Sequence, residues 1–192
     1  MGQNRPVLTD LCSKEYQDVL NSTHRMFNMK WGGGGNRHAQ IVMEFANQLE
    51  AWSILDYGCG RGSLRTAVPW SVVEYDPGIP GKSFLPEPAD LVVCTDVLEH
   101  VEPEKVGNVL QHLRSLTLKG AFFVIALSPA HQILTDGRNA HLSLHPPTWW
   151  LQELEAAGFE IVKSQLKKGL FIWVIPKRPL LARIFKPLRI NK

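Results

Sequence analysis

The sequence predicts an α/β protein with a Rossmann-like, mostly parallel sheet and helices on both faces. Three observations predict this fold. Short apolar segments alternate with segments of helical periodicity, a glycine-rich turn follows the first apolar segment, and the last two apolar segments are joined by only three residues. Strands separated by helices pair in parallel, whereas a three-residue connection makes an antiparallel hairpin. The expected sheet is therefore parallel except for one strand of a C-terminal hairpin.

The individual elements follow from periodicity. Apolar residues at helical spacing predict helices over residues 10–27, 37–49, 103–116 and 148–157, and a brief helix over 64–68. Short apolar runs predict strands over residues 52–57, 72–75, 90–94, 121–127, 159–166 and 170–175. Pro103 is tolerated near a helix start, and Gly158 is suited to a helix end.

Four consecutive glycines at 32–35 separate the first two helices. Such a run cannot lie inside a helix or strand without a large entropic cost. We expect a loop, which is either a lid over a binding site or a plain linker.

Size and composition fit one folded domain. The 192 residues are 44% hydrophobic and 20% charged, both ordinary values. We expect a helical cap and glycine-rich loop at 1–50, a core at 51–176 and a basic tail at 177–192. The first thirty residues lack the apolar stretch of a signal peptide, and no apolar run is long enough to cross a bilayer. The three cysteines are far apart, which favours reduced thiols and a cytoplasmic protein.

The net charge of +3 is concentrated in the tail. Residues 177–192 hold six basic and no acidic residues, so the remainder of the chain is mildly acidic. The tail also carries leucine, isoleucine and phenylalanine. It is suited to an anionic membrane surface or a nucleic-acid backbone, or it is simply solvated.

The main functional signal is Asp-Tyr-Gly-Cys-Gly-Arg-Gly at 56–62, directly after an apolar strand. Glycines allow a tight turn and let a ligand approach the main chain closely. Asp76 follows the next strand, where a carboxylate can accept hydrogen bonds from ribose hydroxyls. These features indicate a site for an adenosyl ligand.

The charge of Asp56 favours a cationic ligand. A carboxylate about 4 Å from a pyrophosphate would cost on the order of 1 kcal/mol in water-like surroundings and about 4 kcal/mol near a protein surface. The same group attracts an ammonium and a sulfonium. The spacing GxGxG also differs from the GxGxxG of dinucleotide sites. We expect S-adenosylmethionine as the cofactor.

The segment 54–63 resembles the first motif of class I S-adenosylmethionine-dependent methyltransferases. Val-Glu-Tyr-Asp at 73–76 is similar to the second motif of that family, and residues 90–101, ending in Leu-Glu-His-Val, resemble the fourth. Residues 117–125 look like the fifth strand and the turn before it. The resemblance implies a sheet of seven strands, or an abbreviated version of it.

The resemblance also implies a set of cofactor contacts. The glycine turn would line the methionine end and the adenosine, Asp76 would hold the ribose, and the main chain after the third strand would close over the methionine. The implied residues are Asp56, Tyr57, Gly58, Cys59, Gly60, Gly62, Asp76, Pro77, Cys94, Thr95 and Asp96.

One segment departs from the family pattern. Only thirteen residues separate Asp76 from Asp90, and four of them are prolines. Prolines oppose a helix, and a parallel crossover usually needs a dozen or more residues. The usual helix and third strand of the family are therefore expected to be reduced to a loop or a short edge.

Candidates for the chemistry follow the ends of two strands. Transfer from a sulfonium needs in-line placement and exclusion of water, and a hydroxyl or protonated amine acceptor also needs a base. The candidates are Asp96, His100, His141 and His145. His100 has a structural alternative as a residue that caps a helical turn. His141 and His145 have the i,i+4 spacing of metal ligands, but two prolines follow directly, so we expect no metal site there.

The predicted function is methyl transfer to an acceptor that the sequence does not identify. Residues 95–98 read Thr-Asp-Val-Leu instead of the Asn/Asp-Pro-Pro-aromatic run of amino-directed nucleic-acid enzymes, and the chain has no Pro-Cys dipeptide. A small molecule or saccharide is therefore favoured over nucleic acid. Two alternatives are a non-catalytic binding protein or partner-activated subunit, and a lyase that consumes the sulfonium.

Overall fold

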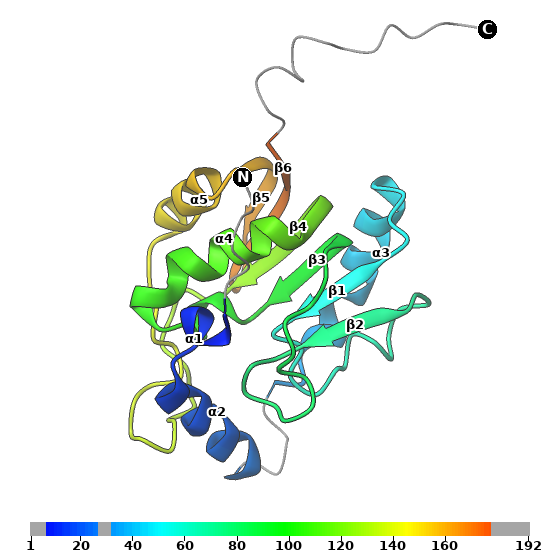
Figure 1. Cartoon of the computed structure of the whole chain (residues 1–192). Helices are drawn as coiled ribbons and strands as arrows, with labels where there is room; N and C mark the ends of the chain where they lie inside the picture. Colours follow the sequence, from blue (N-terminus) through cyan, green and yellow to red (C-terminus); the bar gives the residue numbers. More distant parts are fainter. Residues whose placement is uncertain (1–6, 27–31, 178–192) are drawn as a thin grey trace, which may run out of the picture.

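Helices precede three successive strands, after which helices and strands alternate up to a C-terminal hairpin (Figure 1). The computed structural model describes residues 7–26 and 32–177. Its strands are β1 (Ile54–Tyr57), β2 (Val72–Tyr75), β3 (Ala89–Thr95), β4 (Thr117–Ile125), β5 (Phe159–Leu166) and β6 (Leu170–Pro176). Its α-helices are α1 (Leu8–Leu11), α2 (Lys14–Met26), α3 (Ala39–Gln48), α4 (Val106–Leu116) and α5 (Pro147–Ala156). Three short 3₁₀ turns are η1 (Gly35–His38), η2 (Leu98–His100) and η3 (Pro103–Lys105).

The strands form one sheet in the order β2-β1-β3-β4-β6-β5. The pairs β1–β2, β1–β3 and β3–β4 are parallel, and β6 runs antiparallel to both β4 and β5. The prediction of a mostly parallel sheet with one antiparallel hairpin strand is confirmed. Because β1, β3 and β4 are central, their predominantly apolar residues are buried on both faces.

Helices cover both faces of the sheet, as Figure 1 shows. Helices α1, α4 and α5 pack on one face, against residues such as Leu55, Val92 and Phe123. Helix α3 packs on the other, against Ile54 and Phe122 and their neighbours. Successive residues of a strand therefore pack into two separate hydrophobic cores, because side chains alternate between the two faces of a sheet.

The sheet has six strands in the described residues, so the abbreviated form of the predicted sheet is the one observed. Residues 77–88 form turns and irregular backbone between β2 and β3. Four prolines in this segment remove backbone donors and oppose a helix, which accounts for the missing strand and crossover helix. The usual seven-strand count therefore does not apply to the part of the chain that the structure describes.

Other boundaries differ from the sequence prediction. Residues 64–68 form turns, so the brief helix predicted there is wrong. The helix predicted over 10–27 is two helices, separated near Ser13, and residue 27 lies outside the described residues. Strand β4 begins at Thr117 directly after α4, whereas the sequence predicted its start at 121. The predicted basic tail lies outside the described residues except for Lys177, so its contacts stay predictions.

Helix α2 packs away from the two main cores. Its residues Tyr16 and Leu20 form a third apolar cluster with Leu134 and Ala140 from the loop between β4 and α5. Side-chain contacts support this packing, because Thr135 N donates to Thr23 Oγ1 at 3.4 Å. Helix α2 is thereby held over the ends of the strands. None of the described helices is both long enough and apolar enough to traverse a lipid bilayer.

Candidate cofactor and acceptor site

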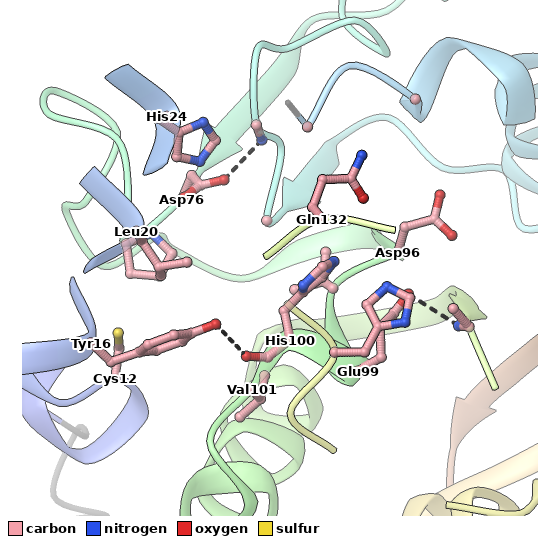
Figure 2. A pocket seen from close by; sticks show the side chains of 18 of the residues that line it. Cys12, Tyr16, Leu20, His24, Asp76, Asp96, Glu99, His100, Val101 and Gln132 are labelled. Carbon is pink, nitrogen blue, oxygen red and sulfur yellow. Dashed lines mark hydrogen bonds between the residues drawn. The ribbon is translucent and has the colours of Figure 1, made fainter. Parts of the chain in front are cut away.

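A cavity of about 650 Å³ lies at the carboxyl ends of the four parallel strands. Its lining includes Gly58 after β1, Asp76 after β2, Asp96 after β3 and Ala126 after β4. The carboxyl edge of an open α/β sheet is where such folds bind ligands. Helix α2 contributes the opposite wall, with Tyr16, Leu20 and His24 pointing into the space (Figure 2).

The glycine turn after β1 needs glycine at each of its three positions. Gly58, Gly60 and Gly62 have φ values of +75°, +52° and +77°, which side chains rarely adopt. A Cβ atom would also collide with Val97 at Gly58, with the Gly32 carbonyl at Gly60, and with the Glu74 carboxylate at Gly62. The turn is therefore both conformationally and sterically restricted to glycine, and Gly58 and Gly60 line the cavity.

Asp76 connects the turn to the end of β2. Its two carboxylate oxygens accept hydrogen bonds from Gly60 N–H and Gly78 N–H, both at 2.9 Å. Burial raises the pKa of Asp76, while these two N–H groups and nearby His24 oppose the rise. Burial lowers the pKa of His24. Figure 2 shows the His24 ring beside Asp76 at one end of the cavity.

Asp56 lies within β1 and does not line the cavity. Its side chain is 3% exposed, and burial raises its pKa to about 7, with Glu74 and Asp76 adding to the rise. Lys82 opposes the rise, because its ammonium lies near these carboxylates and donates to the Gly60 carbonyl at 3.1 Å. The carboxylate that faces the cavity at this end is therefore Asp76.

The glycine run at 32–35 lies against the glycine turn. Arg61 N–H donates to the Gly32 carbonyl at 3.0 Å, and residues 32–34 line the cavity. The neighbouring Arg37 in η1 donates to the Gly34 carbonyl at 3.1 Å and forms an ion pair with Asp96 across the cavity, Nη2 to Oδ2, at 2.9 Å. Residues 32–34 are therefore part of the cavity wall, and the lid and the linker both stay interpretations of this glycine run.

The other end of the cavity holds an acid and two histidines. Glu99 and His100 come from η2, directly after the β3 end, and His141 comes from the loop between β4 and α5. Both imidazoles direct Nδ1 to a backbone carbonyl: His100 to Ala140 at 2.7 Å, and His141 to Ser128 at 2.5 Å. Since a carbonyl only accepts, each Nδ1 carries a proton, and in the neutral imidazole the lone pair is on Nε2.

Backbone contacts bring this loop to η2. Ser143 N–H donates to the Glu99 carbonyl at 2.9 Å, and Ser143 Oγ–H donates to the Val101 carbonyl at 2.7 Å. The Asn139 side chain closes the loop, because it pairs with both backbone groups of Ala130 and accepts from His141 N–H at 2.9 Å. The phenol of Tyr16 donates to the His100 carbonyl at 2.7 Å, which connects α2 to the same turn (Figure 2).

Burial gives these groups unusual protonation behaviour. Desolvation raises the pKa of Glu99 to about 8, although backbone N–H groups near the carboxylate oppose the rise. Desolvation, with a smaller effect of His141, lowers the pKa of His100 to about 4. At neutral pH the His100 imidazole is therefore neutral. Perturbed titration in a cavity is typical of functional sites.

The structure brings together about half of the sequence-predicted site residues. Those that line the cavity are Gly58, Gly60, Asp76, Pro77, Asp96, His100 and His141. Those that do not are Asp56, Tyr57, Cys59, Gly62, Cys94, Thr95 and His145. The Tyr57 phenol instead contacts His112 Nδ1 at 3.1 Å in the core, and His145 stacks on Trp149 with ring centroids 3.7 Å apart. All three cysteines are buried and free.

Several lining residues were not singled out from the sequence. Tyr16, Leu20 and His24 share one face of α2 at helical spacing. This spacing alone predicts a face that packs in the hydrophobic core, not one that lines a cavity. Arg37 follows the glycine run, and Gln132 lies in the loop after β4. Glu99 belongs to the Leu-Glu-His-Val motif. An acid between an apolar residue and a histidine was a signal that could have identified Glu99 as a site residue.

The family model described as a methyltransferase domain matches residues 32–164, more than half of the chain. The chain belongs to this family. The class I resemblance seen in the sequence is thereby confirmed for this methyltransferase. The residues that match the family model include the glycine run, the glycine turn, Asp76 and the end of the cavity formed by Glu99, His100 and His141.

Solved methyltransferase structures share the fold. One is the 1,6-didemethyltoxoflavin-N1-methyltransferase of Burkholderia thailandensis, with bound 1,6-didemethyltoxoflavin and S-adenosylhomocysteine; it has a TM-score of 0.61 and 20% identity over 85% of this chain and 90% of that one. Another is magnesium protoporphyrin IX methyltransferase of Synechocystis PCC 6803 with bound S-adenosylhomocysteine; it has a TM-score of 0.58 and 19% identity over 84% and 98%. No curated protein matches the sequence. At these identities the structural comparisons establish the fold.

Proposed function

We propose that this methyltransferase takes a methyl group from S-adenosylmethionine and passes it to a small-molecule acceptor in the same cavity. The observation that carries the proposal is the convergence of Gly58, Asp76 and Asp96, from the ends of three neighbouring strands, on one cavity. A backbone without Cβ atoms lets the cofactor approach closely, and a carboxylate after β2 accepts from ribose hydroxyls.

The charges of the lining support a zwitterionic adenosyl ligand. Asp76 and Asp96 are suited to the sulfonium, the ammonium and the ribose hydroxyls, whereas Arg37 and Arg61 offer guanidinium groups to a carboxylate. A pyrophosphate about 4 Å from either acid would lose on the order of 4 kcal/mol near the protein surface. The cavity therefore favours S-adenosylmethionine over an anionic dinucleotide.

The cavity size supports a small acceptor. Cavities of about 300–1,000 Å³ typically hold one drug-sized ligand. The observed 650 Å³ must accommodate the cofactor together with the acceptor group. The acceptor is therefore a small molecule, or a small group, such as one sugar, at the end of a larger molecule. The two similar solved structures named above are methyltransferases of small molecules, one of 1,6-didemethyltoxoflavin and one of magnesium protoporphyrin IX.

The acceptor group would lie between the sulfonium and the histidine end of the cavity. The neutral thioether leaves without acid assistance, so the protein must align the acceptor and exclude water. Helix α2 and residues 32–34 serve the exclusion of water, because they cover the ends of the strands. The Nε2 lone pairs of His100 and His141 provide the basic groups at which an acceptor proton is drawn away.

Calorimetry and mass spectrometry of the purified chain test the proposal. We expect S-adenosylmethionine or S-adenosylhomocysteine to co-purify or to titrate with one site per chain, and NAD to give no heat. Methyl-labelled cofactor incubated with host extract should then label the small-molecule fraction. Tight uptake of NAD without binding of either adenosyl compound would refute the proposal.

The same labelling experiment separates the alternatives. Release of methylthioadenosine instead of S-adenosylhomocysteine would indicate a lyase. Cofactor binding without label transfer to small molecules, saccharides, protein or nucleic acid would indicate a non-catalytic binding protein or a subunit that needs a partner. Label in the nucleic-acid fraction alone would contradict the proposed acceptor class.

A further inference from the structure

Glu99, His100 and His141 form a compact group of metal-ligand side chains at one end of the cavity. One ligand atom from each residue can be chosen so that all three lie within 4.8 Å of one another. The imidazoles of His100 and His141 meet edge to face, with ring centroids 4.8 Å apart and an interplanar angle of 78°. Across residues 7–26 and 32–177, this is the one group of three such residues identified.

The orientation of both imidazoles matches that of metal-ligating histidines. Such histidines usually donate one ring N–H to a carboxylate or a backbone carbonyl, which fixes the ring and places the lone pair on the other nitrogen. His100 Nδ1 is 2.7 Å from the Ala140 carbonyl, and His141 Nδ1 is 2.5 Å from the Ser128 carbonyl. Each Nε2 consequently carries the lone pair that a cation needs.

The carboxylate of Glu99 supplies an independent observation. Its side chain is fully buried at 0% exposure, and its Oε1 accepts from Ala126 N–H at 3.0 Å. Its Oε2 receives no hydrogen bond of good geometry from the described residues. A buried carboxyl oxygen without a partner costs free energy, and a cation that displaces any proton from this acid would supply the missing interaction. Figure 2 shows Glu99 and His100 at the same end of the cavity.

The donor set indicates the class of cation. Two imidazoles and one carboxylate are typical of open sites for zinc and for other divalent transition metals, whereas magnesium and calcium prefer oxygen ligands. Ligands about 2.1 Å from a tetrahedral ion lie about 3.4 Å apart. The separation of up to 4.8 Å would therefore shorten by about 1.4 Å through side-chain rotation when an ion binds.

We propose that Glu99, His100 and His141 bind one divalent transition-metal ion of the zinc and cobalt class, with its open coordination positions facing the cavity. Such an ion takes up the two Nε2 lone pairs and the Oε2 of the acid. If the chain methylates as proposed above, the ion also defines the acceptor as a metal-binding oxygen compound. A hydroxyl bound to the ion would lose its proton more readily, and the proton would pass to solvent water, because the Nε2 atoms of both histidines would then be ligands instead of bases. This consequence rests on the proposed function, but metal binding itself does not.

The test uses the full chain without a histidine tag, stripped of metal by dialysis against a chelator. Calorimetric titration with Zn²⁺ should show one site per chain, and titration with Mg²⁺ should show much weaker binding. The Co²⁺-loaded chain should show the visible absorption of a four- or five-coordinate ion, and X-ray absorption of the Zn²⁺-loaded chain should count two imidazoles. Absence of a Zn²⁺ site, or a site without imidazole ligands, would overturn the proposal.

Matched variants assign the site. Glu99→Gln and His141→Ala should each weaken Zn²⁺ binding by more than about 100-fold, because each removes a direct ligand. His131→Ala removes an exposed histidine of the same loop that does not line the cavity, and it should bind Zn²⁺ as the parent does. Circular dichroism establishes that each variant is folded. Undiminished binding by folded Glu99→Gln and His141→Ala chains would contradict the assignment.

The two proposals fail in different ways. Zn²⁺ binding with no uptake of S-adenosylmethionine would refute the proposed function and leave the metal site in place. Methyl transfer that is indifferent to chelation, in a chain with no Zn²⁺ or Co²⁺ site, would refute the metal site and leave the methyltransferase.

Discussion

The backbone of Gly32 lies directly against Gly60. A Cβ atom at Gly60 would fall 2.9 Å from Gly32 Cα and collide with its carbonyl oxygen, and the same carbonyl accepts from Arg61 N–H at 3.0 Å. The glycine run and the glycine turn, which are far apart in the sequence, therefore restrict each other. A side chain at either position would change the shape of the proposed cofactor site.

Gly60→Ala should abolish measurable cofactor binding. The new methyl group would displace residue 32, and the φ of +52° is strained for alanine. Gly107→Ala is the matched control, because Gly107 lies in α4 with no atom within 4 Å of an added Cβ. We expect the control to bind S-adenosylhomocysteine normally and to gain about 0.5–1 kcal/mol in stability. Titration calorimetry and thermal unfolding measure both effects, and normal binding by Gly60→Ala would refute the packing argument.

Arg37→Ala should weaken cofactor binding with little effect on stability. The Arg37–Asp96 pair is partly exposed, and pairs of this kind contribute only about 0–1 kcal/mol to folding. Its guanidinium nevertheless lines the cavity and is the group proposed for the cofactor carboxylate. We expect the Kd for S-adenosylmethionine to rise by about tenfold or more, as for a lost charge-assisted hydrogen bond.

Arg65→Ala is the control for charge. Arg65 has a similarly exposed side chain and pairs with Glu74 at 3.7 Å, but it does not line the cavity. It should leave the Kd near the parental value. Equal losses of affinity in both variants would show that net charge is responsible, and would remove Arg37 from the proposed contact.

Asp56→Asn should stabilise the ligand-free protein increasingly as the pH rises. Burial raises the pKa of Asp56 from 3.8 to about 7, so the folded state retains a proton that the unfolded state loses. The stability associated with this group is complete below pH 3.8 and is lost as the pH rises through 7. The difference in unfolding free energy between variant and parent should grow between pH 4 and pH 8. The full shift in the pKa of Asp56 corresponds to a change in unfolding free energy of at most about 4 kcal/mol.

Denaturant unfolding at pH 4, 6 and 8 measures this difference. The charged groups that influence the pKa of Asp56 are Glu74, Asp76 and Lys82, and all three remain in the variant. A difference in stability that is constant across this pH range would show that Asp56 titrates normally in the folded protein.

Topology explains which site residues the sequence could predict. Gly58, Asp76 and Asp96 each follow the carboxyl end of a strand, and parallel strands bring those ends to one edge. Recognition of the strands was therefore sufficient to place these residues together. The proline-rich segment 77–88 likewise predicted the shortened sheet, because proline excludes a helix by a local rule.

Residues whose position depends on tertiary packing could not be predicted. Helix α2 reaches the cavity because it packs on the loop after β4, through contacts such as Thr135 to Thr23, and no local pattern encodes these. Asp56 was expected to attract a cationic ligand, yet it is buried inside the sheet. His141 and His145 are equivalent in the sequence, but the loop closed by Asn139 directs only His141 into the cavity.

His141→Ala and His145→Ala should therefore differ in activity. His141 lines the cavity and orients its Nε2 lone pair through the hydrogen bond to Ser128, so its loss removes either a base or a metal ligand. We expect kcat to fall by about 10²-fold or more. His145 stacks on Trp149 outside the cavity, so its loss should affect stability more than turnover. Steady-state methyl transfer to the acceptor found by labelling measures both. Parental turnover by His141→Ala would remove this histidine from the reaction, and a loss confined to His145→Ala would show that the relevant surface lies at the start of α5.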